Sequence, residues 1–212
     1  MRLVLLSDTH NQHADLPPIP DGDLLVHAGD LTCRGTLPEL CSALHFLAAL
    51  PHRHKIVIAG NHDRLFETDP GLARSLIPAG VTYLEDAGTV VEGVRIWGSP
   101  WQPAFMDWAY NLRTRDALAA RWARIPDDTQ LLITHGPRYR LLDRVHDPRQ
   151  HVGCPDLRER VRALPDLRLH VFGHIHDAAG RLTIQGVTYA NASITIDEDT
   201  GIRPPLVIDL AF

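Results

Sequence analysis

Short runs of apolar, mostly branched residues recur along the chain, and each run stops at a cluster of polar residues. The runs cover residues 3–6, 23–27, 56–59, 131–133 and 169–172. An apolar run without alternation is typical of a strand that is buried on both faces. The chain is therefore expected to enclose its sheets between other layers.

A helical pattern separates the second and third of these runs. Leucines recur there at spacings of four and three residues, which indicates an amphipathic helix. Thr36 is a candidate N-cap for it, Pro38 suits its first turn, and Pro51 is placed to end it. Strands that alternate with helices predict a layered α/β sandwich rather than an all-β barrel.

Further strands, partly antiparallel, are expected in the later part of the chain. Their ranges are 89–91, 94–97, 182–184, 187–189 and 206–210, with hairpin turns at Glu92-Gly93 and Gln185-Gly186. Residues 100–112 are rich in aromatic residues and proline without clear periodicity, so a structured loop is expected there.

Length, charge and cysteine content limit the class of protein. With 212 residues and no low-complexity linker, a single domain over residues 1–212 is expected. The net charge of -5 argues against extended nucleic-acid binding and leaves a small anionic substrate as the expected partner. No apolar run is long enough for a membrane span, and the three cysteines form no paired motif. A cytoplasmic monomer or homodimer is the prediction.

Five of the expected strands end in groups of polar residues. In open α/β sheets ligands bind beyond the carboxyl ends of the strands, so these groups are expected to be neighbours in space. They read Asp8-Thr9-His10, Gly29-Asp30, Gly60-Asn61-His62-Asp63, Thr134-His135-Gly136 and Gly173-His174-Ile175-His176.

Carboxylates, an amide oxygen and several imidazoles form the donor set that a pair of divalent cations needs. A single zinc ion would use only three or four of these groups. Carboxylates suit manganese and imidazoles suit iron, zinc or nickel, so the predicted cofactor is two divalent metal ions, Mn²⁺ first, with Fe, Zn, Ni or Co as alternatives. Two close cations need a bridging anion, and Asp30 is the candidate. A lone Asp or His at a strand end is commonly only a loop residue or a helix cap, so the prediction depends on the whole set.

The order of these motifs resembles the calcineurin-like metallophosphoesterase superfamily. The resemblance spans residues 8 to 176. Segments such as Gly98-Ser99-Pro100-Trp101 and Val152-Gly153-Cys154 resemble one group of this superfamily, the metallophosphoesterase-domain-containing (MPPED) group. That group is similar to the class III cyclic nucleotide phosphodiesterases. The resemblance implies an αββα sandwich of two mixed sheets flanked by helices.

The resemblance also implies residue roles. It assigns Asp8, His10, Asp30 and His176 to the first metal, and Asp30, Asn61, His135 and His174 to the second. A hydroxide bridging the two cations would attack phosphorus. His62 would contact the phosphate and protonate the leaving oxygen. Its neighbour Asp63 is a candidate to orient it, with a plain loop carboxylate as the alternative. Apart from the resemblance, the position of Arg138 after the turn at residues 134–137 makes it a candidate phosphate contact, with a solvated surface charge as the alternative.

The expected function is a metal-dependent phosphodiesterase for small nucleotide diesters, such as 2′,3′- or 3′,5′-cyclic nucleotides. Alternatives are a catalytically weak nucleotide-binding or scaffold protein, a phosphomonoesterase, or a nuclease. Trp101 and Phe105 are expected to pack over the sandwich, with base stacking as the alternative. His27 and His170 are expected in the core, and Cys154 at a helix start.

Overall fold

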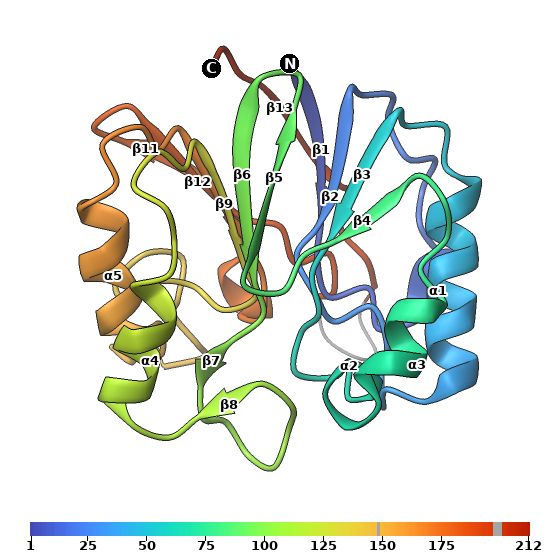
Figure 1. Ribbon diagram of the computed structural model, residues 1–212, viewed down its shortest axis with the longest axis horizontal. Coiled ribbons are helices and arrows are strands. Elements are labelled where there is room, and N and C mark those ends of the chain that lie inside the picture. The colour runs from blue at the N-terminus through green and yellow to red at the C-terminus, as the bar shows by residue number, and fades with distance from the viewer. Residues whose placement is uncertain (148, 197–200) are drawn as a thin grey trace.

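A computed structural model of the protein describes residues 1–147, 149–196 and 201–212 and contains two β-sheets between two layers of helices (Figure 1). The first sheet has the order β13-β1-β2-β3-β4 and the second has the order β11-β12-β10-β9-β6-β5. Both sheets are mixed, because β13, β11 and β5 pair antiparallel with otherwise parallel neighbours. The αββα sandwich expected for the chain is confirmed.

The strands of the first sheet are β1 (Arg2–Leu6), β2 (Leu24–His27), β3 (His54–Val57), β4 (Val81–Tyr83) and β13 (Leu206–Asp209). Those of the second are β5 (Ala87–Val91), β6 (Val94–Ser99), β9 (Leu131–Thr134), β10 (Leu169–Phe172), β11 (Gly180–Ile184) and β12 (Val187–Asn191). The two predicted hairpin turns join β5 to β6 and β11 to β12.

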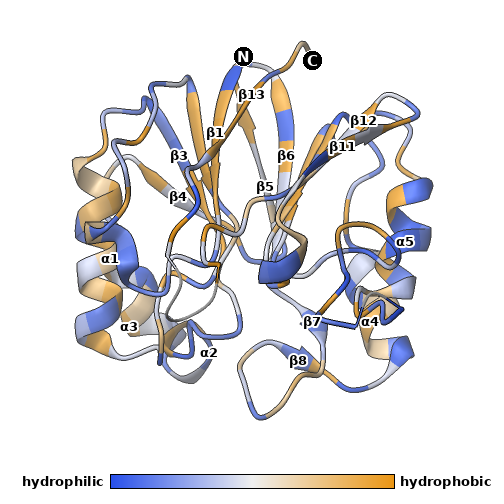
Figure 2. Ribbon diagram, turned by 180° about the vertical axis from the view of Figure 1, so that it is seen from behind, coloured by the Kyte–Doolittle hydropathy of each residue, from blue (hydrophilic) through white to orange (hydrophobic). Residues whose placement is uncertain are grey.

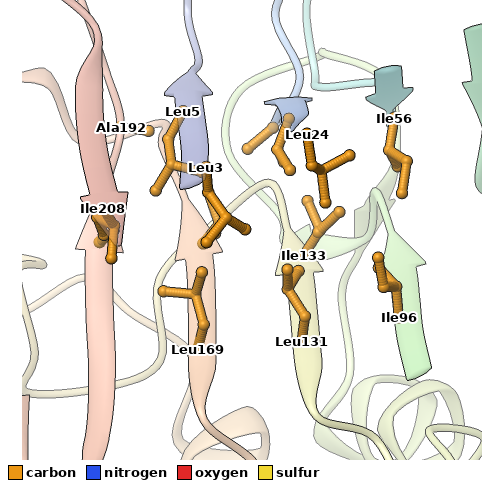
Figure 3. Close-up of a cluster of buried hydrophobic side chains, with 14 of the residues drawn as sticks. Leu3, Leu5, Leu24, Ile56, Ile96, Leu131, Ile133, Leu169, Ala192 and Ile208 are labelled. Carbon is orange, nitrogen blue, oxygen red and sulfur yellow. The ribbon is translucent and has the colours of Figure 1, made fainter. Parts of the chain in front are cut away.

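Successive residues of the central strands point to different cores, which explains their apolar runs. Leu3 and Leu5 of β1 pack between the two sheets, whereas Val4 and Leu6 pack under the helices of the first sheet. Figure 3 shows the core between the sheets, where Leu3 and Leu5 meet side chains such as Leu169 of the second sheet. Figure 2 shows that the central strands are mainly hydrophobic, whereas α5 is largely hydrophilic.

The helices cover the outer faces of the sheets. In Figure 1, α1 (Leu37–Ala49) and α3 (Pro70–Ser75) flank the first sheet, near α2 (Leu65–Thr68), while α4 (Arg115–Trp122) and α5 (Pro155–Arg162) flank the second. Short 3₁₀ turns lie at Gln12–Ala14 and His176–Ala178. Thr36 caps α1 through a complete capping box with Glu39, and Cys154 is the N-cap of α5, as the sequence predicted. No helix in the described part of the chain is long and apolar enough to cross a membrane.

The structure contains elements that the sequence patterns did not predict. They are β4, α2, α3 and α4, none longer than eight residues. The third predicted strand also ends two residues early, at Val57, although the amide of Ile58 still donates to the carbonyl of His27 in β2. Residues 100–112 are mostly loop, as expected, but they include the short parallel pair β7 (Gln102–Pro103) and β8 (Asn111–Leu112).

Candidate metal centre

The five polar groups that follow the strands meet at one edge of the sandwich. Backbone hydrogen bonds link their loops: the amide of Asp8 donates to the carbonyl of Gly29 at 2.9 Å, and that of Gly173 donates to His135 at 2.8 Å. The imidazole Nδ1 of His135 lies 3.0 Å from the carbonyl of Ala28, in the other sheet. Parallel strands end at the same edge of a sheet, and two packed sheets bring both sets of ends together.

Asp30 lies at the centre of the cluster and is only 2% exposed. Its Oδ2 is 3.3 Å from Nε2 of His135 and 3.8 Å from Nε2 of His10. Its Oδ1 accepts a hydrogen bond of 2.8 Å from the amide of His62. One carboxylate oxygen therefore faces imidazoles from both sheets, as a bridging ligand must.

Two groups of side chains at the cluster could each hold a metal ion, and Asp30 belongs to the second group. Potential ligand atoms of Asp8, His10 and His176 lie within 4.8 Å of one another, and so do those of Asp30, His135 and His174. The amide Oδ1 of Asn61 lies 2.8 Å from Nε2 of His135. The structure thus brings together all seven residues that the sequence suggested as ligands.

In two of these histidines, a hydrogen bond at the ring nitrogen Nδ1 places a proton on that nitrogen. Nδ1 of His10 faces the carbonyl of Thr32 at 3.2 Å, and Nδ1 of His135 faces that of Ala28. A carbonyl only accepts, so each Nδ1 carries hydrogen and each Nε2 is left to hold a proton or a cation. Nε2 of each ring faces an oxygen of Asp30, and Nε2 of His135 also faces Oδ1 of Asn61. A cation can take the place of a proton between these atoms, so the residues present fit a metal pair.

The pKa values of the buried groups also indicate a site for positive charge. Burial alone would raise the pKa of Asp30, but the facing imidazoles outweigh it and hold that pKa far below its ordinary value. Burial opposes a charged His135, yet the charge and hydrogen bond of Asp30 raise its pKa to about 9. Burial, together with the charge of His135, lowers the pKa of His174 to about 3, so His174 is neutral. The centre attracts positive charge, whether as protons or as metal ions.

The backbone at the site is held in uncommon conformations. Asp8, His10, Asp30 and His174 all have positive φ, between 41° and 67°. Non-glycine residues rarely adopt this region, and such residues cluster at functional sites. At Gly60 a Cβ atom would lie 2.2 Å from Oδ1 of Asp30, so only glycine allows the loops to approach this closely.

His62 lies beside the cluster with partners of its own. Its Nδ1 is 2.5 Å from the carbonyl of Cys33, and its ring stacks on Trp108 with centroids 3.9 Å apart. A ring nitrogen of His62 also lies within 4.8 Å of potential ligand atoms of His10 and Asp30, which places His62 next to the centre. Trp108 was not singled out from the sequence, where the only signal was the density of aromatic residues in 100–112.

Asp63 does not contact the ring of His62, contrary to the orienting role suggested for it. Its carboxylate accepts hydrogen bonds from the amides of Gly60, Leu31 and Thr32 and from the hydroxyl of Thr32, at 2.7–3.2 Å. Burial and the charge of Asp30 raise its pKa to about 6. Asp63 therefore fixes the two loops that carry Asp30 and His62 and touches neither reactive group.

Arg138 is also displaced from its suggested role as a phosphate contact. Its guanidinium is buried and lies over the ring of Tyr189, with 4.9 Å between the Arg carbon and the ring centroid. Tyr189 belongs to the core beneath α4 and α5, on the face of the second sheet away from the first. The negative face of the aromatic ring attracts the guanidinium to that side, so Arg138 packs on the second sheet.

The remaining side chains discussed for the sequence divide between core and surface. His27 and His170 are buried, as expected. Trp101 packs as expected, with Arg121 over its ring at 4.2 Å. Phe105 does not pack over the sandwich: it is 47% exposed, and its ring meets that of His174 edge to face.

Comparison with known proteins identifies the architecture around this centre. Residues 1–178 match the family model described as calcineurin-like phosphoesterase. The chain belongs to this family. It is 39% identical to metallophosphoesterase domain-containing protein 1 of Homo sapiens, across 99% of this chain and 71% of that protein. It is 35% identical to the Caenorhabditis elegans protein UPF0046 protein K07C11.7, across 91% of this chain and 69% of that protein.

Solved structures agree on the fold. The crystal structure of TT1561 of Thermus thermophilus superposes with a TM-score of 0.61 at 11% identity, covering 91% of this chain and 88% of that one. At this identity the likeness concerns the fold alone. The family assignment and the clusters of buried Asp and His side chains together establish a phosphoesterase architecture with candidate metal sites.

Two cavities open onto the centre of this phosphoesterase. One, here called the His62 cavity, has a volume of about 490 Å³ and is lined by His10, Gln12, Cys33, Arg34, His62, Trp108, His176 and Thr195. The other, the Phe105 cavity, has about 540 Å³ and a mainly apolar lining that includes Phe105, Val145, Val152 and Ile196 beside His174 and His176. His176 lines both, so the cavities adjoin at the candidate metal centre.

Proposed function

We propose that the protein is a two-metal phosphodiesterase that hydrolyses small nucleotide diesters, such as 2′,3′- or 3′,5′-cyclic nucleotides. The observation that carries this proposal is the convergence on Asp30 of ligand-type side chains from both sheets, with His62 beside them. Two divalent cations held there, of which Mn²⁺ suits the mixed carboxylate and imidazole set, would polarise phosphoryl oxygens and lower the pKa of water.

The two adjoining cavities support a diester over a monoester. A phosphodiester carries two organic substituents on one phosphorus, whereas a monoester carries one. A phosphate at the centre can direct one substituent into the His62 cavity and the other into the Phe105 cavity. In a cyclic nucleotide, both ester oxygens belong to one sugar. The sugar would then lie at one cavity, and the base would occupy the other.

His62 is the proposed general acid. Its Nδ1 faces the carbonyl of Cys33, so the opposite nitrogen, Nε2, is the one that transfers a proton. Stacking on Trp108 fixes the plane of the ring. As the P–O bond of the leaving group breaks, Nε2 would give its proton to the departing alkoxide, which leaves as an alcohol. The amide of His62 also donates to Asp30, which ties the acid to the metal centre.

Other residues would orient rather than react. The exposed Arg34 lines the His62 cavity, and no ion pair of its guanidinium occurs among the described residues. It is therefore placed to meet an anionic group on the leaving side. The cytoplasmic location and the monomeric or homodimeric state stay predictions from the sequence.

Substrate panels test the proposal directly. Purified protein loaded with Mn²⁺ is expected to hydrolyse bis(p-nitrophenyl) phosphate and cyclic nucleotides faster than p-nitrophenyl phosphate, measured as kcat/KM. A strong preference for the monoester would overturn the diester assignment and leave the metal centre intact. Tight nucleotide binding without hydrolysis of any substrate, over several metals, would contradict an enzyme altogether.

A further inference from the structure

The side chain of Gln102 contains a buried oxygen that the protein leaves unpaired. Gln102 is 1% exposed, and its Oε1 has no hydrogen-bond partner among the described residues. A buried acceptor without a partner costs about 1–3 kcal/mol, and native proteins pair nearly all such groups. Gln102 lines the Phe105 cavity. A molecule bound in the Phe105 cavity is therefore the candidate hydrogen-bond donor.

Asn111 decides which way the Gln102 amide faces. Nδ2 of Asn111 donates to the carbonyls of Phe105 and Met106 at 3.2 and 3.1 Å, and its Oδ1 accepts from the amide of Phe105 at 3.1 Å. The Gln102 atom 3.4 Å from this Oδ1 must then be the NH₂ group, because two oxygens would repel. The unpaired atom is thus an acceptor, and it requires an N–H or O–H donor.

The unpaired oxygen lies close to the metal centre. A Cβ atom placed on Gly136, the residue after the proposed ligand His135, would be 4.0 Å from it. Gly136 and His174 line the same cavity. A substituent that extends from a phosphate at the centre into this cavity would therefore reach Gln102 at the end of the cavity nearest His174.

The rest of the cavity suits a flat apolar group. Phe105 presents a largely exposed ring at the cavity, and aromatic rings hold nucleobases by stacking. Val145, Val152 and Ile196 add apolar walls. A flat ring with a hydrogen-bond donor at its edge satisfies both the walls and the oxygen.

We infer that Gln102 is a specificity-determining residue that accepts a hydrogen bond from the exocyclic amino group of a nucleobase bound in the Phe105 cavity, an inference that rests on the proposed nucleotide diesterase function. Sites built to pair a polar group reject analogues that lack it, because the buried partner is then unpaired. Gln102 therefore selects bases by the presence of this donor.

Nucleotide pairs that differ by one amino group test the inference. Calorimetry with the Mn²⁺-loaded protein would compare adenosine 5′-monophosphate with purine riboside 5′-monophosphate, and guanosine with inosine 5′-monophosphate. The donor-bearing member of at least one pair is expected to bind 10-fold or more tightly. In Gln102→Met, which keeps the size and removes the acceptor, the two members should bind equally. Equal binding by the unaltered protein, or discrimination that persists in Gln102→Met, would overturn the inference.

A neighbouring residue provides the control. Met106 is 71% exposed and does not line the cavity, so Met106→Ala should keep the discrimination. A second variant, Gln102→Leu, covers the case in which Gln102→Met fails to fold, which circular dichroism would reveal. Binding is measured without turnover. Failure to hydrolyse any diester would therefore contradict the proposed function and still leave the role of Gln102 decided.

Discussion

At the scale of single residues, two histidines with similar hydrogen bonds have different surroundings. His62 and His135 each place Nδ1 against a backbone carbonyl. Nε2 of His135 then faces oxygens of Asp30 and Asn61, where a cation fits, whereas the His62 ring is held by Trp108 beside a cavity. The surroundings therefore favour a ligand role for His135 and an acid role for His62.

Removing the His62 ring should impair proton transfer without removing metal. His62→Ala is expected to lower kcat by about 10²–10⁴-fold on a diester with a poor leaving group, because general acid catalysis contributes roughly that much. The loss should be smaller with p-nitrophenolate, which leaves without a proton. His45→Ala, at an exposed position on α1, is the matched control. Unchanged turnover with the poor leaving group would refute the acid assignment.

Asp30 and Asp8 should differ in their effect on metal content. Asp30 is proposed to bridge both ions and Asp8 to bind one. Elemental analysis after removal of free metal is expected to give fewer than one ion per chain for Asp30→Asn and about one for Asp8→Asn. Two retained ions in Asp30→Asn would show that it is no bridge.

At the scale of elements, one loop supplies aromatic rings to both cavities. Between β7 and β8, Phe105 meets His174 and Trp108 stacks on His62. The loop is tied to the site because the amide of Ala109 donates to the carbonyl of Asn61 at 3.1 Å, and Arg64 lies over the ring of Trp108. The packing of β7 and β8 therefore controls the shape of both cavities.

A buried carboxylate anchors the start of this region to α4. Oδ2 of Asp86 accepts from Trp101, Arg121 and Arg124 at 2.9–3.0 Å, and its Oδ1 accepts from Ser99 at 2.8 Å. Asp86→Ala leaves the buried hydroxyl of Ser99 and the part-buried indole of Trp101 unpaired and should lower the free energy of unfolding by about 2–3 kcal/mol in urea titrations. Asp128→Ala, which removes an exposed pair with Arg95, should cost about 1 kcal/mol or less. Equal losses would contradict the anchoring role.

At the scale of the whole molecule, burial of neutral histidines between the layers couples stability to pH. Burial, with a smaller effect from the charge of Arg138, lowers the pKa of His170 to about 3, against 6.5 for an ordinary histidine. Below pH 6.5 the unfolded chain binds a proton at His170, whereas the folded protein does not. Stability from this residue is thus complete above pH 6.5 and is lost as the pH falls toward 3.

The variant His170→Gln should reduce this dependence. Between pH 7 and pH 5 the metal-free protein is expected to lose about 2 kcal/mol more unfolding free energy than the variant, because His170 alone contributes about that amount. Urea titrations at pH 7, 6 and 5 measure the difference. Parallel pH profiles for the two proteins would show that His170 does not resist protonation.

The sequence alone determined the layers and the candidate ligands, because both depend on local patterns. Apolar runs had to become strands buried on both faces, and the polar groups that end them had to meet at one edge. The helix capped by Thr36 was equally local. Short elements such as α2, α3 and β4 escaped prediction, since segments of three to six residues are too short to establish a period.

Only the tertiary structure decided where side chains outside the motifs act. Asp63 and Arg138 are adjacent to or near ligands in the sequence, yet one binds backbone amides and the other lies over Tyr189 beneath the helices. Trp108 and Gln102 reach the site through β7, β8 and the loop between them. Spacing along the chain cannot predict these contacts, because they depend on which face of a packed sheet each long side chain reaches.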